Sequence, residues 1–137
     1  MAHQFVAFSE EELDTDLTLD TAYRTKNGIT LTLTLQGAMP SGFRKAQHDA
    51  TVELRLAKNS VLKVALPGAA NLFAVDYTTP TKATDQFAIT SGETTQHFDG
   101  SIKPASAVLW ADGIETPEIS NPVDDLHLSR LSWSATD

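Results

Sequence analysis

The sequence predicts an all-β protein: an antiparallel β-sandwich, jelly-roll-like in arrangement, with eight to ten short strands. Leucine, isoleucine and valine alternate with threonine and other polar residues at a period of two, which is the pattern of half-buried strands. Turn-forming residues recur every ten or so positions, and no regular alternation of strands with helices is visible. A closed β-barrel is the alternative architecture.

The chain of 137 residues contains no internal repeat and no low-complexity linker, so residues 1–137 are expected to form a single domain. Cysteine is absent, which excludes a disulfide framework, a zinc–thiolate site and a cysteine nucleophile. The N-terminal segment has neither a basic stretch nor a long apolar stretch. This predicts no signal peptide, and a protein that is cytoplasmic or exported by a non-classical route.

The region from Leu17 to Leu35 predicts a hairpin around Lys26, Asn27 and Gly28. A two-residue Asn-Gly turn would set charged residues against the leucines of the second strand. A three-residue turn instead pairs Thr25 with Ile29 and, further along, Leu19 with Leu35, so that both apolar sets share one face. Gly28 then takes the left-handed position of a β-bulge.

The same reasoning predicts a second hairpin. Alternating apolar residues in 52–56 and 62–66 flank Lys58, Asn59 and Ser60. A three-residue turn places these apolar residues on one face, and Asn59 is the best candidate for the unusual turn dihedrals.

Shorter strands are expected in the second half of the chain: 71–77, 85–90, 94–98 after a turn at 91–93, and 106–111. Residues 114–125 contain two prolines and four acidic residues, and are interpreted as an irregular loop. In the final segment, 126–134, a bulge near Ser129 and Arg130 would keep all four large apolar residues on one face. Near the N-terminus, Ser9 to Glu12 resembles a capping box, with room for one helical turn.

The formal net charge is −8, of which residues 69–137 carry −7. Such an acidic protein is expected to bind neither nucleic acid nor anionic membranes. The acids Asp14, Asp16 and Asp20 lack the glycine and glutamate of an EF-hand loop and are interpreted as solvent-facing residues of a strand. The four histidines are dispersed, without metal-ligand spacing, so no metal and no other cofactor is predicted.

The best candidate for a binding site surrounds Trp110 and Asp112. An exposed indole beside a carboxylate can stack on a sugar ring and accept its hydroxyl groups, and this pair sits at a strand end, where loops form sites. Asn121 and Asp124 in the following loop are included in the predicted site. The competing interpretation takes Trp110 into the core as a continuation of the apolar strand, and Trp133 is expected there as well.

The leading functional hypothesis is a non-catalytic binding or assembly protein, which binds a protein partner or forms a homo-oligomer through an open sheet edge. If the strand 29–35 lies at an edge, it is the expected pairing surface. The first alternative is a carbohydrate-binding module that uses the Trp110 region and binds a glycan. The second is a hydrolase with two strand-borne carboxylates. The nucleophile motif of serine hydrolases and the phosphate-binding loops are absent.

Overall fold

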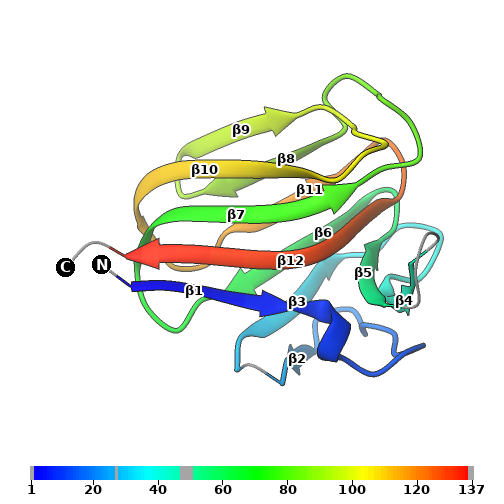
Figure 1. The fold of residues 1–137 in the computed structure, drawn as a ribbon, viewed down its shortest axis with the longest axis horizontal. Helices are drawn as coiled ribbons and strands as arrows, with labels where there is room; N and C mark the ends of the chain where they lie inside the picture. The colour runs from blue at the N-terminus through cyan, green and yellow to red at the C-terminus, as the bar shows by residue number, and fades with distance from the viewer. Residues whose placement is uncertain (1, 27, 47–50, 136–137) are drawn as a thin grey trace.

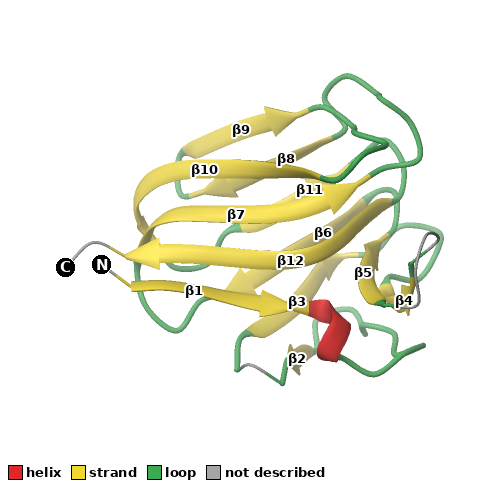
Figure 2. Cartoon of the chain, viewed as in Figure 1, coloured by secondary structure: helices red, strands yellow, loops and turns green. Residues whose placement is uncertain are grey.

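The computed structural model describes residues 2–26, 28–46 and 51–135 as two six-stranded antiparallel sheets that pack face to face (Figures 1 and 2). Sheet A consists of β1 (Ala2–Ala7), β4 (Gly42–Lys45), β5 (Val52–Leu56), β7 (Ala70–Thr78), β10 (Ala105–Ile114) and β12 (Leu126–Ala135). Sheet B consists of β2 (Ala22–Arg24), β3 (Thr30–Leu35), β6 (Ser60–Ala65), β8 (Phe87–Ser91), β9 (Thr94–Phe98) and β11 (Glu118–Asn121).

The predicted fold class is confirmed, although the described residues form twelve strands rather than eight to ten. In sheet A the order is β10-β7-β12-β5-β4, and β1 pairs with the far end of β12; in sheet B the order is β2-β3-β6-β11-β8-β9. No described strand pairs between the sheets, so they form a sandwich rather than the closed barrel. The core lies between them and contains side chains from both, including Leu33, Leu62, Phe73 and Leu131.

The first predicted hairpin register is confirmed close to its turn. Tyr23 lies opposite Leu31, and the backbone N–H of Thr25 donates to the carbonyl of Ile29 at 2.9 Å. Gly28 has φ = +89°, a conformation that glycine adopts without steric cost. Asn27 lies outside the described residues.

The predicted pairing of Leu19 with Leu35 is wrong. Leu19 instead forms an isolated parallel bridge with Leu33, because Asp20 takes a left-handed conformation (φ = +58°) that ends the antiparallel ladder. β3 lies between β2 and β6, so it is not an open edge available for pairing with another chain.

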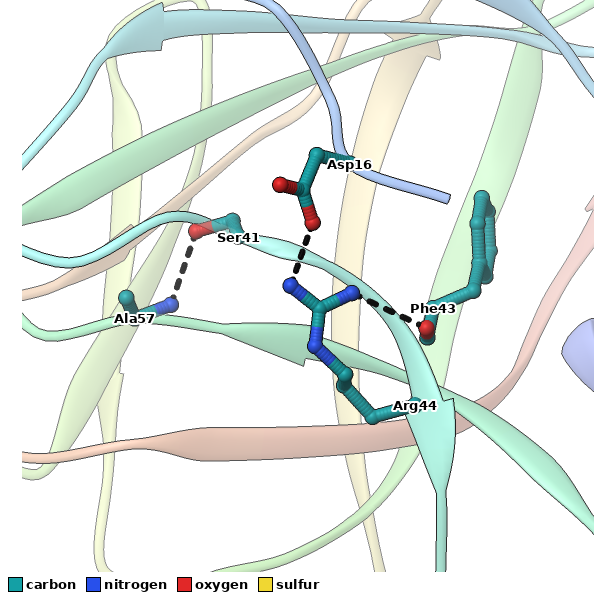
Figure 3. A network of polar contacts seen from close by, with 5 residues as sticks. All are labelled: Asp16, Ser41, Phe43, Arg44 and Ala57. Carbon is teal, nitrogen blue, oxygen red and sulfur yellow. Dashed lines mark hydrogen bonds and ion pairs between the residues drawn. The ribbon is translucent and has the colours of Figure 1, made fainter. Parts of the chain in front are cut away.

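The acidic stretch before β2 is a loop rather than the predicted strand. Asp14 has φ = +62°, and Asp16 forms an ion pair with Arg44 of β4, as Figure 3 shows. Arg44 also donates to the carbonyl of Phe43 at 3.0 Å, and Ser41 Oγ accepts the N–H of Ala57 at 2.9 Å. The Asp16–Arg44 pair fastens the N-terminal loop to β4, and the Ser41–Ala57 hydrogen bond joins the residue before β4 to the residue after β5.

The second predicted hairpin is wrong in its pairing, although its faces are correct. β5 pairs with β4 and β12 in sheet A, whereas β6 pairs with β3 and β11 in sheet B. Leu56 and Leu62 both point into the core, but they do so from opposite sheets. Asn59 takes the expected left-handed conformation (φ = +64°), and it turns the chain from one sheet to the other.

The bulge predicted near Ser129 and Arg130 is confirmed, because the register of β12 against β7 shifts between Leu128 and Arg130. Leu126 and Leu128 on one side of the bulge, and Leu131 and Trp133 on the other, are therefore all buried.

The interpretation of residues 114–125 as an irregular loop is wrong. Residues Glu118–Asn121 form β11, which pairs with both β6 and β8 inside sheet B. The predicted turn at 91–93 is confirmed as the connection between β8 and β9, where Ser91 lies opposite Thr94.

The helical content is small. The only helix within the described residues is the 3-10 turn η1 (Phe8–Glu10), and Ala7 rather than Ser9 precedes it as the N-cap, without a side-chain capping bond. The capping-box interpretation of Ser9 is therefore wrong. Among the described residues, no helix is long or apolar enough to cross a membrane.

We expect the Asn59→Val variant to be destabilised by about 1–2 kcal/mol, because a β-branched residue is strained in the left-handed conformation. The matched control is Lys58→Val, which changes a neighbouring exposed residue that has no positive φ. Urea unfolding of the three proteins measures the difference, and equal midpoints for the two variants would contradict the role assigned to Asn59.

We expect a loss of stability at alkaline pH that depends on Tyr23. Burial, together with the hydrogen bond that its hydroxyl donates to Glu11 Oε1 at 2.7 Å, raises the pKa of Tyr23 from 10.0 to about 12. The folded state therefore holds the phenol proton more tightly than the unfolded chain. This stabilisation is complete below pH 10 and is lost as the pH rises towards 12. Urea unfolding across this pH range should show a steeper fall of the unfolding free energy in wild type than in Tyr23→Phe. Parallel falls in the two proteins would contradict the role assigned to Tyr23.

Candidate functional site

Trp110 projects from the outer face of β10, an edge strand of sheet A. Its side chain is 68% exposed, whereas its neighbours in the strand, Ala107 and Leu109, are buried in the core. Strand alternation requires this outward direction, so the interpretation of Trp110 as a core residue is wrong. Trp133 is only 5% exposed and does lie in the core, as predicted.

A β-bulge directly after Trp110 presents Asp112. Trp110 pairs with Leu72 and Ile114 pairs with Ala70, so residues 111–113 of β10 lie opposite one residue of β7. Gly113 has φ = +63°, which is the conformation that allows such a bulge. The predicted end of the strand at Asp112 and Gly113 is therefore a bulge, and the strand continues to Ile114. The bulge turns Asp112 outwards, where it is exposed.

A shallow depression joins Trp110 to the other sheet. It is lined by Asn71 of β7, by Trp110, Ala111, Asp112 and Gly113 of β10, and by Ser91, Gly92, Glu93 and Thr94 of the β8–β9 turn. We call it the Trp110 depression. It combines one large aromatic surface with the carboxylates of Asp112 and Glu93, all of them exposed.

In the row beside Trp110, the outer face of sheet A carries three small side chains and ends at a phenylalanine of β1. Val108, Ala74, Ser132 and Phe5 lie opposite one another across β10, β7, β12 and β1. Phe5 is 52% exposed, and its ring lies 5.1 Å from the guanidinium of Arg130. Three strand spacings place it about 14 Å from β10.

Charged and polar side chains cross the same face in the next row. Asp76 accepts a hydrogen bond from Ser106 Oγ at 2.6 Å through one oxygen, and its other oxygen lies 3.3 Å from Arg130 Nε. These contacts link β10, β7 and β12, so the side chains on this face are held in place before any ligand arrives.

The structure places Asn121 and Asp124 away from Trp110. Asn121 lies beside the end of β5 and the start of β6, at the opposite end of the sandwich. It is 1% exposed; its Nδ2 donates to the carbonyl of Leu56 at 2.8 Å, and its Oδ1 accepts from Gln86 Nε2 at 2.9 Å. Gln86 also donates to the backbone carbonyl of Asp124. Of the four residues predicted to bind, only Trp110 and Asp112 come together.

The distant histidines are not brought together. His97 lies on β9 in sheet B and His127 on β12 in sheet A, while His48 is outside the described residues. Within the described ranges, no three histidine, aspartate or glutamate side chains are grouped so that they could hold a metal ion.

A second cavity, of about 250 Å³, lies at the other end of sheet A's outer face. We call it the His127 pocket. Strand residues Glu53, Thr78 and His127 line it together with loop residues Pro80, Ile102 and Pro104. His127 Nδ1 lies 2.7 Å from Glu53 Oε1, and both side chains are nine-tenths buried. This pocket is not predictable from the sequence, because its strand residues alternate as ordinary solvent-facing positions.

Comparisons with known proteins show similarity in fold. No family model and no curated protein matches the chain. Among solved structures, a family two carbohydrate esterase from Cellvibrio japonicus is similar with a TM-score of 0.60 and 10% identity, over 98% of this chain and 34% of that one. The present chain therefore spans about a third of the length of the esterase.

Two further structures are similar over most of this chain. The catalytic unit of a GH87 alpha-1,3-glucanase from Streptomyces thermodiastaticus has a TM-score of 0.54 and 12% identity, over 90% of this chain and 27% of that one. The CBM36-1 domain of a multidomain xylanase, from the hindgut metagenome of Trinervitermes trinervoides, has a TM-score of 0.51 and 14% identity. The match covers 80% of this chain and 99% of the domain.

We expect Asn121→Ala to destabilise the protein by about 1–3 kcal/mol, because it leaves the buried carbonyl of Leu56 without its donor. Asp124→Ala should cost less, since Gln86 contacts only the backbone of Asp124. Thermal unfolding of both variants measures this difference. A larger loss in Asp124→Ala than in Asn121→Ala would contradict the assignment.

Proposed function

We propose that this protein is a non-catalytic carbohydrate-binding module whose site is the Trp110 depression. The single observation that carries the proposal is the 68% exposure of Trp110 beside Asp112 and Glu93. Large aromatic side chains normally bury most of their surface. An indole left open on a rigid strand, with carboxylates at its edge, offers an apolar surface for one face of a sugar ring. The carboxylates accept hydrogen bonds from its hydroxyl groups.

The charge of the site favours a neutral glycan. Asp112 and Glu93 are both acidic, and the depression contains no lysine or arginine. Anionic sugars such as uronic acids or sulfated glycans would therefore be repelled. Neutral pentose or hexose chains meet an aromatic surface, two carboxylate acceptors, and the amide and hydroxyl groups of Asn71, Ser91 and Thr94, without charge repulsion.

The comparisons support this proposal over the self-association hypothesis. One similar structure, matched over nearly its whole length, is the CBM36-1 domain of a xylanase, while the esterase and the glucanase resemble this chain over about a third of their length or less. We accordingly propose that this chain is a non-catalytic binding domain.

The exposure of the two carboxylates favours binding over hydrolysis. Glycoside hydrolases use a pair of carboxyl groups, one of which is an acid kept protonated by a water-poor environment. Asp112 and Glu93 both face solvent at a shallow surface, and they are assigned to hydroxyl recognition.

We expect Trp110→Ala to weaken binding of neutral oligosaccharides by about 30-fold or more, the loss of roughly 2 kcal/mol that a central aromatic anchor contributes. Suitable probes are xylohexaose and an alpha-1,3-linked glucan oligosaccharide, measured by calorimetry and by tryptophan fluorescence. The fluorescence response should vanish in the variant, because the remaining Trp133 is buried.

The matched control is Met39→Ala, which removes a side chain of similar exposure (66%) from a different loop. It should leave affinity unchanged. If wild type binds neither of these probes nor any neutral glycan on an array, or if Trp110→Ala and Met39→Ala bind equally well, the proposal fails.

A further inference from the structure

We propose that the His127 pocket is a second carbohydrate subsite, which takes one neutral sugar unit. This inference rests on the proposed function, and it adds a site at the opposite end of the same sheet face. Thr78 pairs with His127 at one end of β7, and Leu72 pairs with Trp110 near the other. Six residues of strand separate the two places, a distance of about 20 Å.

The floor of the pocket contains a buried acceptor that the protein does not satisfy. Glu53 Oε1 is fully covered and has no hydrogen-bond donor among the described residues. His127 Nδ1 approaches within 2.7 Å, but the contact is not aligned as a hydrogen bond, and Arg55 lies 3.9 Å away. Buried polar atoms are almost always hydrogen-bonded, and the Glu53 side chain borders the pocket, so its carboxylate is the group of the floor that is suited to a hydrogen-bond donor from a ligand.

Thr78 of β7 supplies a hydroxyl group to the floor of the pocket. Thr78 makes no side-chain hydrogen bond with the described part of the chain, and it lies directly opposite His127. A carboxylate, an imidazole and a hydroxyl in one small cavity can donate to and accept from the hydroxyl groups of a sugar.

The wall of the pocket is apolar and fixed. Pro80, Ile102 and Pro104 offer carbon surface of the kind that packs against the C–H groups of a sugar ring. The two loops that carry them are tied together, because Thr79 N donates to the carbonyl of Ser101 at 2.7 Å and Ser101 N donates to Thr79 Oγ1 at 2.7 Å. Little ordering is therefore needed on binding.

The size of the pocket limits the ligand to a single unit. Its volume of about 250 Å³ is below the roughly 300–1,000 Å³ of cavities that enclose drug-sized ligands. The charge of Glu53 is partly balanced by the guanidinium of Arg55, so a cationic ligand gains less here than at an isolated carboxylate. A neutral monosaccharide fits both the volume and the charge.

The test is an NMR titration of the intact chain with D-xylose and with D-glucose. Backbone amide signals of Thr78, His127 and Ile102 should shift and saturate with at least one of the two sugars. The Thr78→Val variant should raise the dissociation constant at these signals about threefold to tenfold, since it removes one hydrogen bond while keeping a β-branched side chain. Thr32→Val, a half-buried threonine of β3 in sheet B, is the matched control and should leave it unchanged.

Trp110→Ala separates this inference from the proposed function. Monosaccharide binding at the His127 pocket should persist in Trp110→Ala, because the two sites are independent, while oligosaccharide affinity falls. If monosaccharides shift only the signals around Trp110, or if Thr78→Val and Thr32→Val change binding equally, the second subsite is refuted and the proposed function stands. If neither region responds to monosaccharides or oligosaccharides, both proposals fail.

Discussion

The whole arrangement depends on β12 and on the bulge at Ser129. This strand pairs with β7 along one side and with β5 and β1 along the other, so it holds sheet A together. Leu126 and Leu128 before the bulge have even numbers, whereas Leu131 and Trp133 after it have odd numbers. A regular strand would point the two pairs to opposite faces, and the extra residue of the bulge brings all four into the core. The same shift turns Arg130 outwards beside Asp76, so the bulge also organises the outer face.

Periodicity predicts which side of a strand is buried, but not which strand lies beside it. The Gly28 turn was predictable because the burial pattern and the conformational freedom of glycine agree on one register. At Asn59 the same pattern predicts a hairpin, yet the chain crosses to the other sheet. The leucines of two successive strands are buried equally well whether the strands lie in one sheet or in two sheets that face each other. Partner choice depends on distant strands, here β4, β11 and β12, which no local window contains.

Two of the four predicted site residues, Trp110 and Asp112, lie together in the structure, and Asn121 and Asp124 lie elsewhere. The reason why the sequence is ambiguous differs from residue to residue. Trp110 follows buried Ala107 and Leu109 at the opposite parity, so a strict period of two predicts its exposure. A continuous apolar run obscures that parity. The sequence favours a loop at Asn121 because Pro117 and Pro122 flank it, whereas in the structure Asn121 ends a short central strand. Glu53 and Thr78 occupy ordinary outward positions, and only the loops at 79–80 and 102–104 convert those positions into a pocket.

The placement of the two proposed sites has a physical consequence for the proposed recognition of sugars. Each combines side chains of paired strands in sheet A with a neighbouring turn or loop. The side chains between them on β7 and β12 are small or already engaged, such as Ala74 and the Asp76–Arg130 pair. Under the proposed function, a glycan that follows β7 meets side chains that are already engaged with one another between the two sites, so most of its affinity is expected to arise at the two ends. The spacing of those ends, which the strand sets, would then contribute to the selection of sugars.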